Sequence, residues 1–176
     1  KKFINCKDDG EIIFTKNSTE SLNLIAQCFG EKYINEGDEI ISTELEHHAN
    51  YVPWHFLRKK KKATIKFIPV DDDGNLQIEK LSDLITTKTK IISVTHMSNV
   101  TGTIVDIKKI KEIADKFNIP VCVDGTQGAA HLKTDMEELG CDFYAFSAHK
   151  MYGPTGLGLL YICLLYTSPS PRDVEE

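Results

Sequence analysis

The sequence has few cysteines, no cysteine pattern typical of a disulfide framework, and no long hydrophobic run. Its five cysteines are an odd number without C-x-x-C spacing, and two of them, Cys122 and Cys141, lie in apolar, strand-like runs where a free thiol acts as a small hydrophobe. The start of the chain lacks the apolar core of a signal peptide, and no apolar stretch has the length of a membrane span. We therefore expect a cytoplasmic protein in a reducing compartment, without a membrane partner.

Positive charge is also scarce. The 176 residues carry a net charge of −5, which argues against nucleic acid or an anionic membrane as the main partner. The run Arg58–Lys62 is the exception, and a solvated helix end whose cations face the C-terminal dipole is favoured over a binding patch. Hydrophobic residues make up 41% and charged residues 27%, as in an ordinary globular domain.

Short β-branched runs alternate with helical patterns, which predicts an α/β fold: a three-layer α/β/α sandwich around a mixed, mostly parallel, seven-stranded type of sheet. Strands are expected at 39–43, 64–69, 90–95, 119–123, 141–146 and 157–162, and helices at about 18–30, 46–61, 77–85, 106–117 and 134–139. The strand at 157–162 follows its neighbour after a turn too short for a helical crossover, so it should be antiparallel. Residues 1–161 form one domain, and 162–176 are expected to be a tail, disordered from about residue 166 onward.

Reactive side chains follow several of these strands directly. Because the carboxyl ends of parallel strands meet at one edge, where ligands bind in doubly wound sheets, these groups should converge. They are His47, His96 with Ser98 and Asn99, Asp124, and Ser147 with His149 and Lys150.

Such an edge could hold a phosphorylated aldehyde cofactor. A lysine amine can form a Schiff base with an aldehyde, and the Asp124 carboxylate one strand away from Lys150 can pair with a pyridinium nitrogen, as in pyridoxal 5′-phosphate (PLP) sites. Asn17-Ser18-Thr19-Glu20 reads as a capping box at a helix N-terminus that could hold the phosphate. Taken singly, Asp124 is more often a cap, His47 and His48 an exposed pair, Asn99 a turn residue, and Ser-x-His-Lys a surface loop.

Five longer stretches resemble the class V, fold-type I PLP enzymes, and within them most closely the SufS-type cysteine desulfurases, which include selenocysteine lyase-like members. The resemblance covers nearly all of residues 10–161, and its two most specific stretches are Glu-His-His-Ala-Asn-x-Val-Pro-Trp and Ser-x-His-Lys-x-Tyr-Gly-Pro-x-Gly. The stretches are Phe14–Glu20, Gly37–Trp54, Thr95–Gly102, Val123–Ala129 and Asp142–Gly156.

The resemblance implies a role for each matching residue. Lys150 and His47 are the catalytic residues: Lys150 holds PLP as a Schiff base, and His47, not His48, stacks on the ring and moves protons. Asp124 pairs with the ring nitrogen, while Gln127 and Asn99 lie near the phenolic oxygen. The implied phosphate ligands are Ser18, Thr19, Ser147 and His149.

The implied reaction is conversion of L-cysteine, or selenocysteine, to L-alanine with a persulfide destined for iron–sulfur cluster assembly. A homodimer and a sulfur-acceptor protein are the implied partners. The family's nucleophilic Cys and its substrate-binding Arg lie beyond the conserved Lys and have no match here, and Cys163 is too near Lys150 to take that role. We expect a fragment of the large domain with little or no activity alone. Asn17 and Ala148 stand where the family often has Gly, and both are small enough to keep the pocket open.

Three other functions are weighed against this one. Another class V PLP enzyme, such as an aminotransferase, an epimerase or a kynureninase-like hydrolase, would share this half of the site. A non-catalytic nucleotide-binding module is disfavoured, because there is no Walker A motif and Gly153–Gly158 precedes a strand. A metal site built from His47, His48 and His96 is the remaining alternative.

Overall fold

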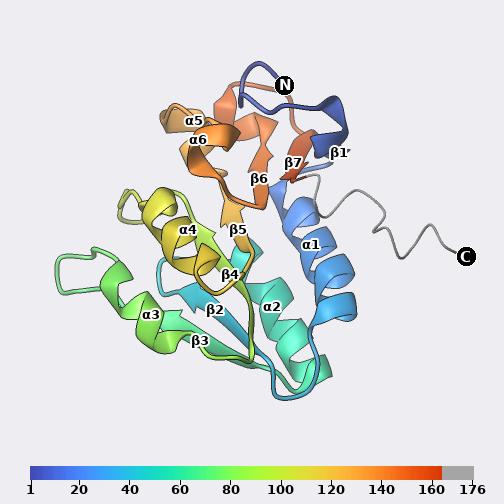
Figure 1. Cartoon of the computed structure of the whole chain (residues 1–176). Coiled ribbons are helices and arrows are strands. Elements are labelled where there is room, and N and C mark those ends of the chain that lie inside the picture. Colours follow the sequence, from blue (N-terminus) through green and yellow to red (C-terminus); the bar gives the residue numbers. More distant parts are fainter. Residues whose placement is uncertain (164–176) are drawn as a thin grey trace, which may run out of the picture.

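A central sheet organises residues 1–163, the part of the chain that the computed structural model describes (Figure 1). In space its seven strands follow the order β1-β7-β6-β5-β4-β2-β3. β7 is antiparallel to both of its neighbours, and the other pairs are parallel, which confirms the mixed sheet and its antiparallel member. The strands are β1 (Ile12–Thr15), β2 (Glu39–Thr43), β3 (Thr64–Ile68), β4 (Thr89–Thr95), β5 (Val121–Asp124), β6 (Phe143–Ser147) and β7 (Gly158–Ile162).

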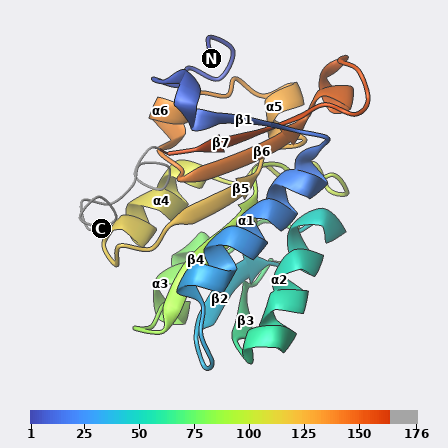
Figure 2. The same ribbon diagram turned by 90° about the vertical axis from the view of Figure 1, so that its right-hand side faces the viewer.

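Helices cover both faces of this sheet, so the predicted three-layer architecture is confirmed. The long helices α1 and α2 lie together on one face, and the shorter helices lie on the other (Figure 2). The α-helices are α1 (Ser18–Tyr33), α2 (His48–Lys61), α3 (Leu81–Leu84), α4 (Ile107–Asp115), α5 (Gly128–His131) and α6 (Met136–Leu139); the 3-10 helices are η1 (Asp9–Glu11), η2 (Ile78–Lys80) and η3 (Ala148–Met151).

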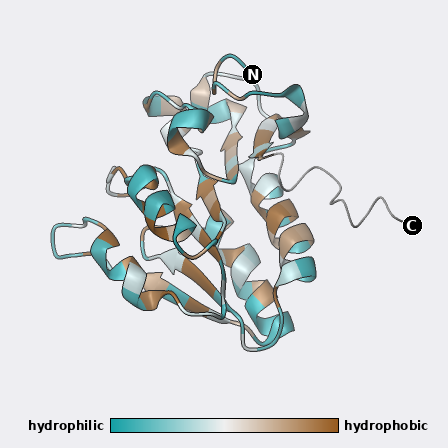
Figure 3. Ribbon diagram, in the orientation of Figure 1, coloured by the Kyte–Doolittle hydropathy of each residue, from teal (hydrophilic) through white to brown (hydrophobic). Residues whose placement is uncertain are grey.

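Two hydrophobic cores separate these layers, because alternate residues of each strand point to opposite faces. In β2, Ile40 packs under α1 and α2, whereas Ile41 belongs to the core under α3 to α6. In β5, Cys122 joins the first core and Val121 and Val123 the second. Figure 3 shows hydrophobic residues along the strands and mixed hydropathy on the helices. Both faces of the sheet are therefore buried, as continuous apolar strands require.

Local signals in the sequence place several element ends. Asn17 caps α1 by accepting a hydrogen bond from the Glu20 backbone N–H at 2.8 Å, but the Glu20 carboxylate accepts from the Lys16 N–H and not from the cap residue, so the capping box is displaced by one residue. Gly140 ends α6 in the left-handed conformation, with φ 66°. The basic run ends α2 as expected, and Lys60 and Lys61 both pair with Glu31 of α1.

Two sequence expectations differ from the structure, and a third lies outside the described residues. β1 was not foreseen: it is a four-residue strand at the sheet edge, paired with β7, and it has no buried run of its own. The expected helix at 106–117 stops at Asp115, so Phe117 lies in the following turn, where 48% of its surface is exposed. The predicted disorder from about residue 166 falls outside the described residues.

The carboxyl ends of β2, β4, β5 and β6 open on one edge of the sheet. The chain crosses from β3, on one side of β2, to β4 on its other side, so the strand order reverses beside β2. Open α/β sheets bind ligands outside the carboxyl ends of the strands at such a switch point. The N-terminus of α1, which follows β1, reaches the same edge (Figure 2).

Candidate active site

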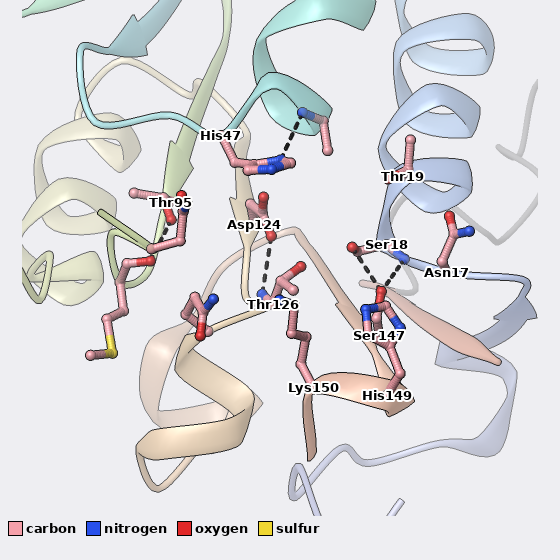
Figure 4. A pocket seen from close by; sticks show the side chains of 14 residues that line it. Asn17, Ser18, Thr19, His47, Thr95, Asp124, Thr126, Ser147, His149 and Lys150 are labelled. Atoms are coloured by element: carbon pink, nitrogen blue, oxygen red, sulfur yellow. Dashed lines mark hydrogen bonds between the residues drawn. The ribbon is translucent and has the colours of Figure 1, made fainter. Parts of the chain in front are cut away.

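A cavity of about 300 Å³ lies at this edge, within the range of small-molecule sites. It gathers groups from β4, β5, η3, the N-terminus of α2 and that of α1 (Figure 4). The nine residues to which the resemblance assigns a role all line it, together with five others. The lining residues are Asn17, Ser18, Thr19, His47, Ala49, Thr95, Met97, Asn99, Asp124, Thr126, Gln127, Ser147, His149 and Lys150.

Lys150 and Asp124 come from neighbouring elements of the same edge and point into the same cavity (Figure 4). Asp124 is the last residue of β5 and pairs in register with Ala145 of β6, while Lys150 follows β6 in η3. The Asp124 side chain is buried, and its Oδ1 accepts the Thr126 backbone N–H at 3.0 Å. Burial raises the pKa of Asp124, while the Thr126 backbone N–H and the nearby His47 oppose the rise. A buried carboxylate of this kind favours a cationic partner.

His47 lies across the cavity from Lys150, near Asp124 (Figure 4). It is the N-cap residue of α2, and its Nδ1 accepts the Ala49 backbone N–H at 3.1 Å. An Nδ1 that accepts a hydrogen bond leaves Nε2 as the protonated nitrogen of the neutral ring. His48 instead lines a different hollow, with Glu44, Tyr51 and Phe67, so the choice of His47 over His48 agrees with the geometry.

The N-terminus of α1 forms the side of the cavity next to β6. The Ser18 backbone N–H donates to Ser147 Oγ at 2.8 Å, and Ser147 Oγ donates to Ser18 Oγ at 2.9 Å. Both serines are buried, whereas Thr19, one residue into α1, is exposed. These bonds join the start of α1 to the end of β6, and a helix N-terminus with hydroxyl side chains suits an anion.

His96 and Ser98 do not reach the cavity, although the sequence grouped them with it. His96 is buried against Tyr144 of β6, and its Nδ1 lies 2.8 Å from the Tyr144 hydroxyl. A Cβ on Gly128 would lie 2.4 Å from the same Nδ1, so the ring fills the space beside α5. Burial lowers the pKa of His96, which keeps the ring neutral. Ser98 is buried within the turn that follows β4, where its Oγ accepts the Val100 and Thr101 N–H groups.

Two polar groups near the site escaped the sequence reasoning. The Thr126 hydroxyl oxygen is buried and has no hydrogen-bond partner among the described residues, although it belongs to a residue that lines the cavity. The half-buried carboxylate of Glu46, one residue before His47, accepts three hydrogen bonds. Both residues lie within the stretches that resemble the family, but their surroundings are formed by the fold and cannot be read from the spacing of residues in the sequence.

Residues 1–163 contain neither a cluster of metal ligands nor a membrane-spanning helix. Their His, Cys, Asp and Glu side chains form no group of three or more that could hold a metal ion. None of their helices is long and apolar enough to cross a membrane. The cavity edge therefore presents an amine, a buried carboxylate, an imidazole and a helix N-terminus, without a metal centre among these residues.

The fold and the cavity define the chain as an α/β ligand-binding domain of the doubly wound kind, with a lysine and a buried aspartate at the carboxyl ends of its strands. Residues 1–167 match the family model described as Aminotransferase class-V, and the chain belongs to that family.

Several similar proteins and structures are described as cysteine desulfurases. The chain is 50% identical over 161 residues to a cysteine desulfurase of Wigglesworthia glossinidia brevipalpis, covering 91% of this chain and 39% of that protein. It is 53% identical to a probable cysteine desulfurase of Staphylococcus aureus, with 92% and 39% covered. The crystal structure of the Escherichia coli cysteine desulfurase CsdA superimposes with a TM-score of 0.89 at 41% identity, covering 92% of this chain and 41% of that one. SspA, solved in complex with cysteine, gives a TM-score of 0.81 at 28% identity, with 87% and 44% covered. The chain thus spans about 40% of the length of these relatives.

Proposed function

We propose that the full-length protein containing this chain is a PLP-dependent cysteine desulfurase. It would convert L-cysteine to L-alanine and pass the sulfur, as a persulfide, toward iron–sulfur cluster assembly. The observation that carries the proposal is the cavity in which Lys150 and Asp124 point toward a common space with His47 beside them (Figure 4). The relatives described as cysteine desulfurases support the choice of reaction.

The residues of the cavity fit PLP. An exposed lysine amine suits its aldehyde, and a buried carboxylate suits its protonated pyridine nitrogen. The serine-linked N-terminus of α1 suits its phosphate. The buried, unpartnered Thr126 hydroxyl beside Asp124 provides a polar group that a bound ligand could satisfy.

Each residue then has a distinct task. PLP, when bound, withdraws electrons from the substrate Cα, and Asp124 would sustain this by keeping the ring nitrogen protonated. Lys150 would hold the cofactor through its amine and move the proton at Cα. His47 would cover the ring and transfer protons from Nε2, since its Nδ1 is occupied by the Ala49 N–H. Gln127 and Asn99 would bind the phenolic oxygen side, while Ser18, Thr19, Ser147 and His149 would bind the phosphate.

The sulfur-accepting thiol is not assigned to this chain. Cys6, Cys122 and Cys141 are buried in the cores, and burial raises the pKa of all three thiols. Cys28 and Cys163 are more accessible but do not line the cavity. We propose that the nucleophile and the carboxylate-binding arginine belong to residues outside this chain, that the protein acts as a cytoplasmic homodimer, and that a sulfur-acceptor protein receives the persulfide.

Trapping the cofactor tests the proposal. The full-length protein is incubated with PLP, reduced with borohydride and digested, and the modified peptide is sequenced. One PLP adduct on Lys150 is expected, together with alanine formation from L-cysteine. Lys150→Ala should remove both, while the exposed Lys59→Ala, matched as a lysine substitution, should leave both unchanged. Adducts spread over surface lysines, or an adduct without cysteine turnover, would respectively contradict the site and the reaction.

A further inference from the structure

Beneath His47 lies a carboxylate to which the proposed function gives no task. Glu46 is in the short segment between β2 and α2, and its half-buried side chain is bonded to β2, β4 and α2. Its Oε1 accepts the Thr43 hydroxyl at 2.6 Å and the Thr95 backbone N–H at 2.8 Å, and its Oε2 accepts the Asn50 amide at 2.6 Å. One side chain therefore joins the ends of β2 and β4 to the first turn of α2.

The direction of these hydrogen bonds follows from Trp54. Its indole N–H can only donate, and it donates to Ser93 Oγ at 2.9 Å. Ser93 Oγ then donates to Asn50 Oδ1 at 2.8 Å. The amide oxygen of Asn50 thus faces Ser93, and its NH₂ group faces Glu46. The chain of bonds ends on Glu46 as an acceptor, so the geometry is built for a carboxylate.

The surroundings of the Glu46 carboxylate disfavour its charged form, and its hydrogen bonds favour that form. Burial raises the pKa of Glu46 to about 7, the nearby Asp124 adds to the rise, and the hydrogen bonds from Thr43, Asn50 and Thr95 oppose it. A carboxylate held by three donors is specific, because an amide of the same shape cannot replace it. A glutamine would turn its NH₂ group toward either the Thr95 N–H or the Asn50 NH₂, leaving two donors face to face.

The orientation of His47 depends on the same turn. The His47 ring is fixed by the bond from the Ala49 N–H to its Nδ1, and His47 C=O accepts the Asn50 and Tyr51 N–H groups. Asn50 is completely buried and is the residue through which Glu46 holds this turn against β4. Thr95, whose backbone N–H donates to Glu46, lines the same cavity as His47.

We propose that Glu46 is a positioning residue for His47: its carboxylate fixes the first turn of α2 against the ends of β2 and β4, and so holds the imidazole over the cavity. The proposal rests on the proposed function for the consequence in catalysis, but not for the positioning itself. Glu46 would act through His47 and touch neither substrate nor cofactor.

Two measurements on the full-length protein test it. The first is amide hydrogen exchange at Ala49 and Thr95 without PLP, in the parent protein and in Glu46→Gln. We expect at least about tenfold faster exchange at both amides in the variant, and no change in Glu44→Gln, a neighbouring exposed glutamate. Thr43→Val, which removes one of the three donors while keeping the shape, should give a smaller change in the same direction and replaces Glu46→Gln if that variant does not fold.

The second measurement is a double-mutant cycle on cysteine turnover with His47→Ala. Glu46→Gln alone should lower kcat about 10- to 100-fold with KM within about threefold, as for a mispositioned catalytic group. It should have no further effect when His47 is already alanine.

The outcomes separate the two ideas. An equal loss from Glu46→Gln in both backgrounds, or unchanged exchange at Ala49, overturns the positioning role. A parent protein that binds PLP but turns over no cysteine overturns the proposed function, while the exchange data still decide the role of Glu46.

Discussion

The close approach of β7 to the start of α1 gives the sharpest structural prediction. Gly158, the first residue of β7, lies against the backbone of Asn17: a Cβ built on Gly158 would lie 2.5 Å from Asn17 Cα, 2.6 Å from its C and 2.7 Å from its N. Ordinary contact begins at 3.4 Å, so Gly158→Ala must move the Asn17 backbone by roughly 1 Å. Backbone cannot swing aside as the end of a flexible side chain can.

That movement reaches the proposed phosphate site directly. Asn17 precedes Ser18, whose N–H and hydroxyl are bonded to Ser147. We expect Gly158→Ala to cost about 1–3 kcal/mol of folding free energy, as overpacking does. Displacing the anion-binding N–H groups should also weaken PLP binding about tenfold or more, or about 1.4 kcal/mol.

The assay is an absorbance titration of the full-length protein with PLP, beside urea unfolding monitored by circular dichroism. Gly10→Ala is the matched control, because its Cβ would meet only the Asp8 side-chain oxygen, at 3.2 Å. If Gly158→Ala keeps both the parent's PLP affinity and its stability, the inferred contact between β7 and the start of α1 is wrong.

Three further predictions follow from the site and its surroundings. Asp124→Ala should lower PLP affinity at least about tenfold in the same titration, and unchanged affinity would exclude the pairing with the ring nitrogen. Trp54→Phe should lower the free energy of unfolding in urea by about 2 kcal/mol, because buried Ser93 and Asn50 lose the indole donor and a small cavity remains. A decrease below about 0.5 kcal/mol would refute this hydrogen-bond network. Burial lowers the pKa of His96 in the folded protein. Below about pH 6.5 the His96 side chain is therefore protonated more in the unfolded chain than in the folded one, and the free energy of unfolding should fall as the pH is lowered. The fall in Tm from pH 7 to 5 should be smaller in His96→Asn, and an identical fall in both proteins would contradict this.

Much of the fold could be predicted from the sequence, because most of its strands are continuous β-branched runs between helical patterns. The prediction missed β1, since a four-residue edge strand with partly exposed residues has no periodic signal. It also missed α5, which has only one turn, and it overextended the helix that ends at Asp115. Those ends are decided by packing and turn geometry, which a single sequence shows weakly.

The candidate site was predictable to the extent that strand ends determine it. Asp124 and Lys150 follow neighbouring strands, and topology alone brings them to one edge. His96 also follows a strand end, but the direction of its side chain depends on Tyr144 and on the space that Gly128 leaves, both distant in sequence. The sequence does not indicate the structural role of Glu46, because its hydrogen-bond partners in β4 and α2 are brought to it only by the fold.

A crystal structure of the full-length protein with PLP bound tests the central claim most directly. We expect continuous density from Lys150 Nζ to the cofactor, the Asp124 carboxylate within about 3 Å of the ring nitrogen, and the His47 ring stacked on the cofactor. Cofactor density at another lysine, or a ring nitrogen that faces away from Asp124, would contradict the assignment.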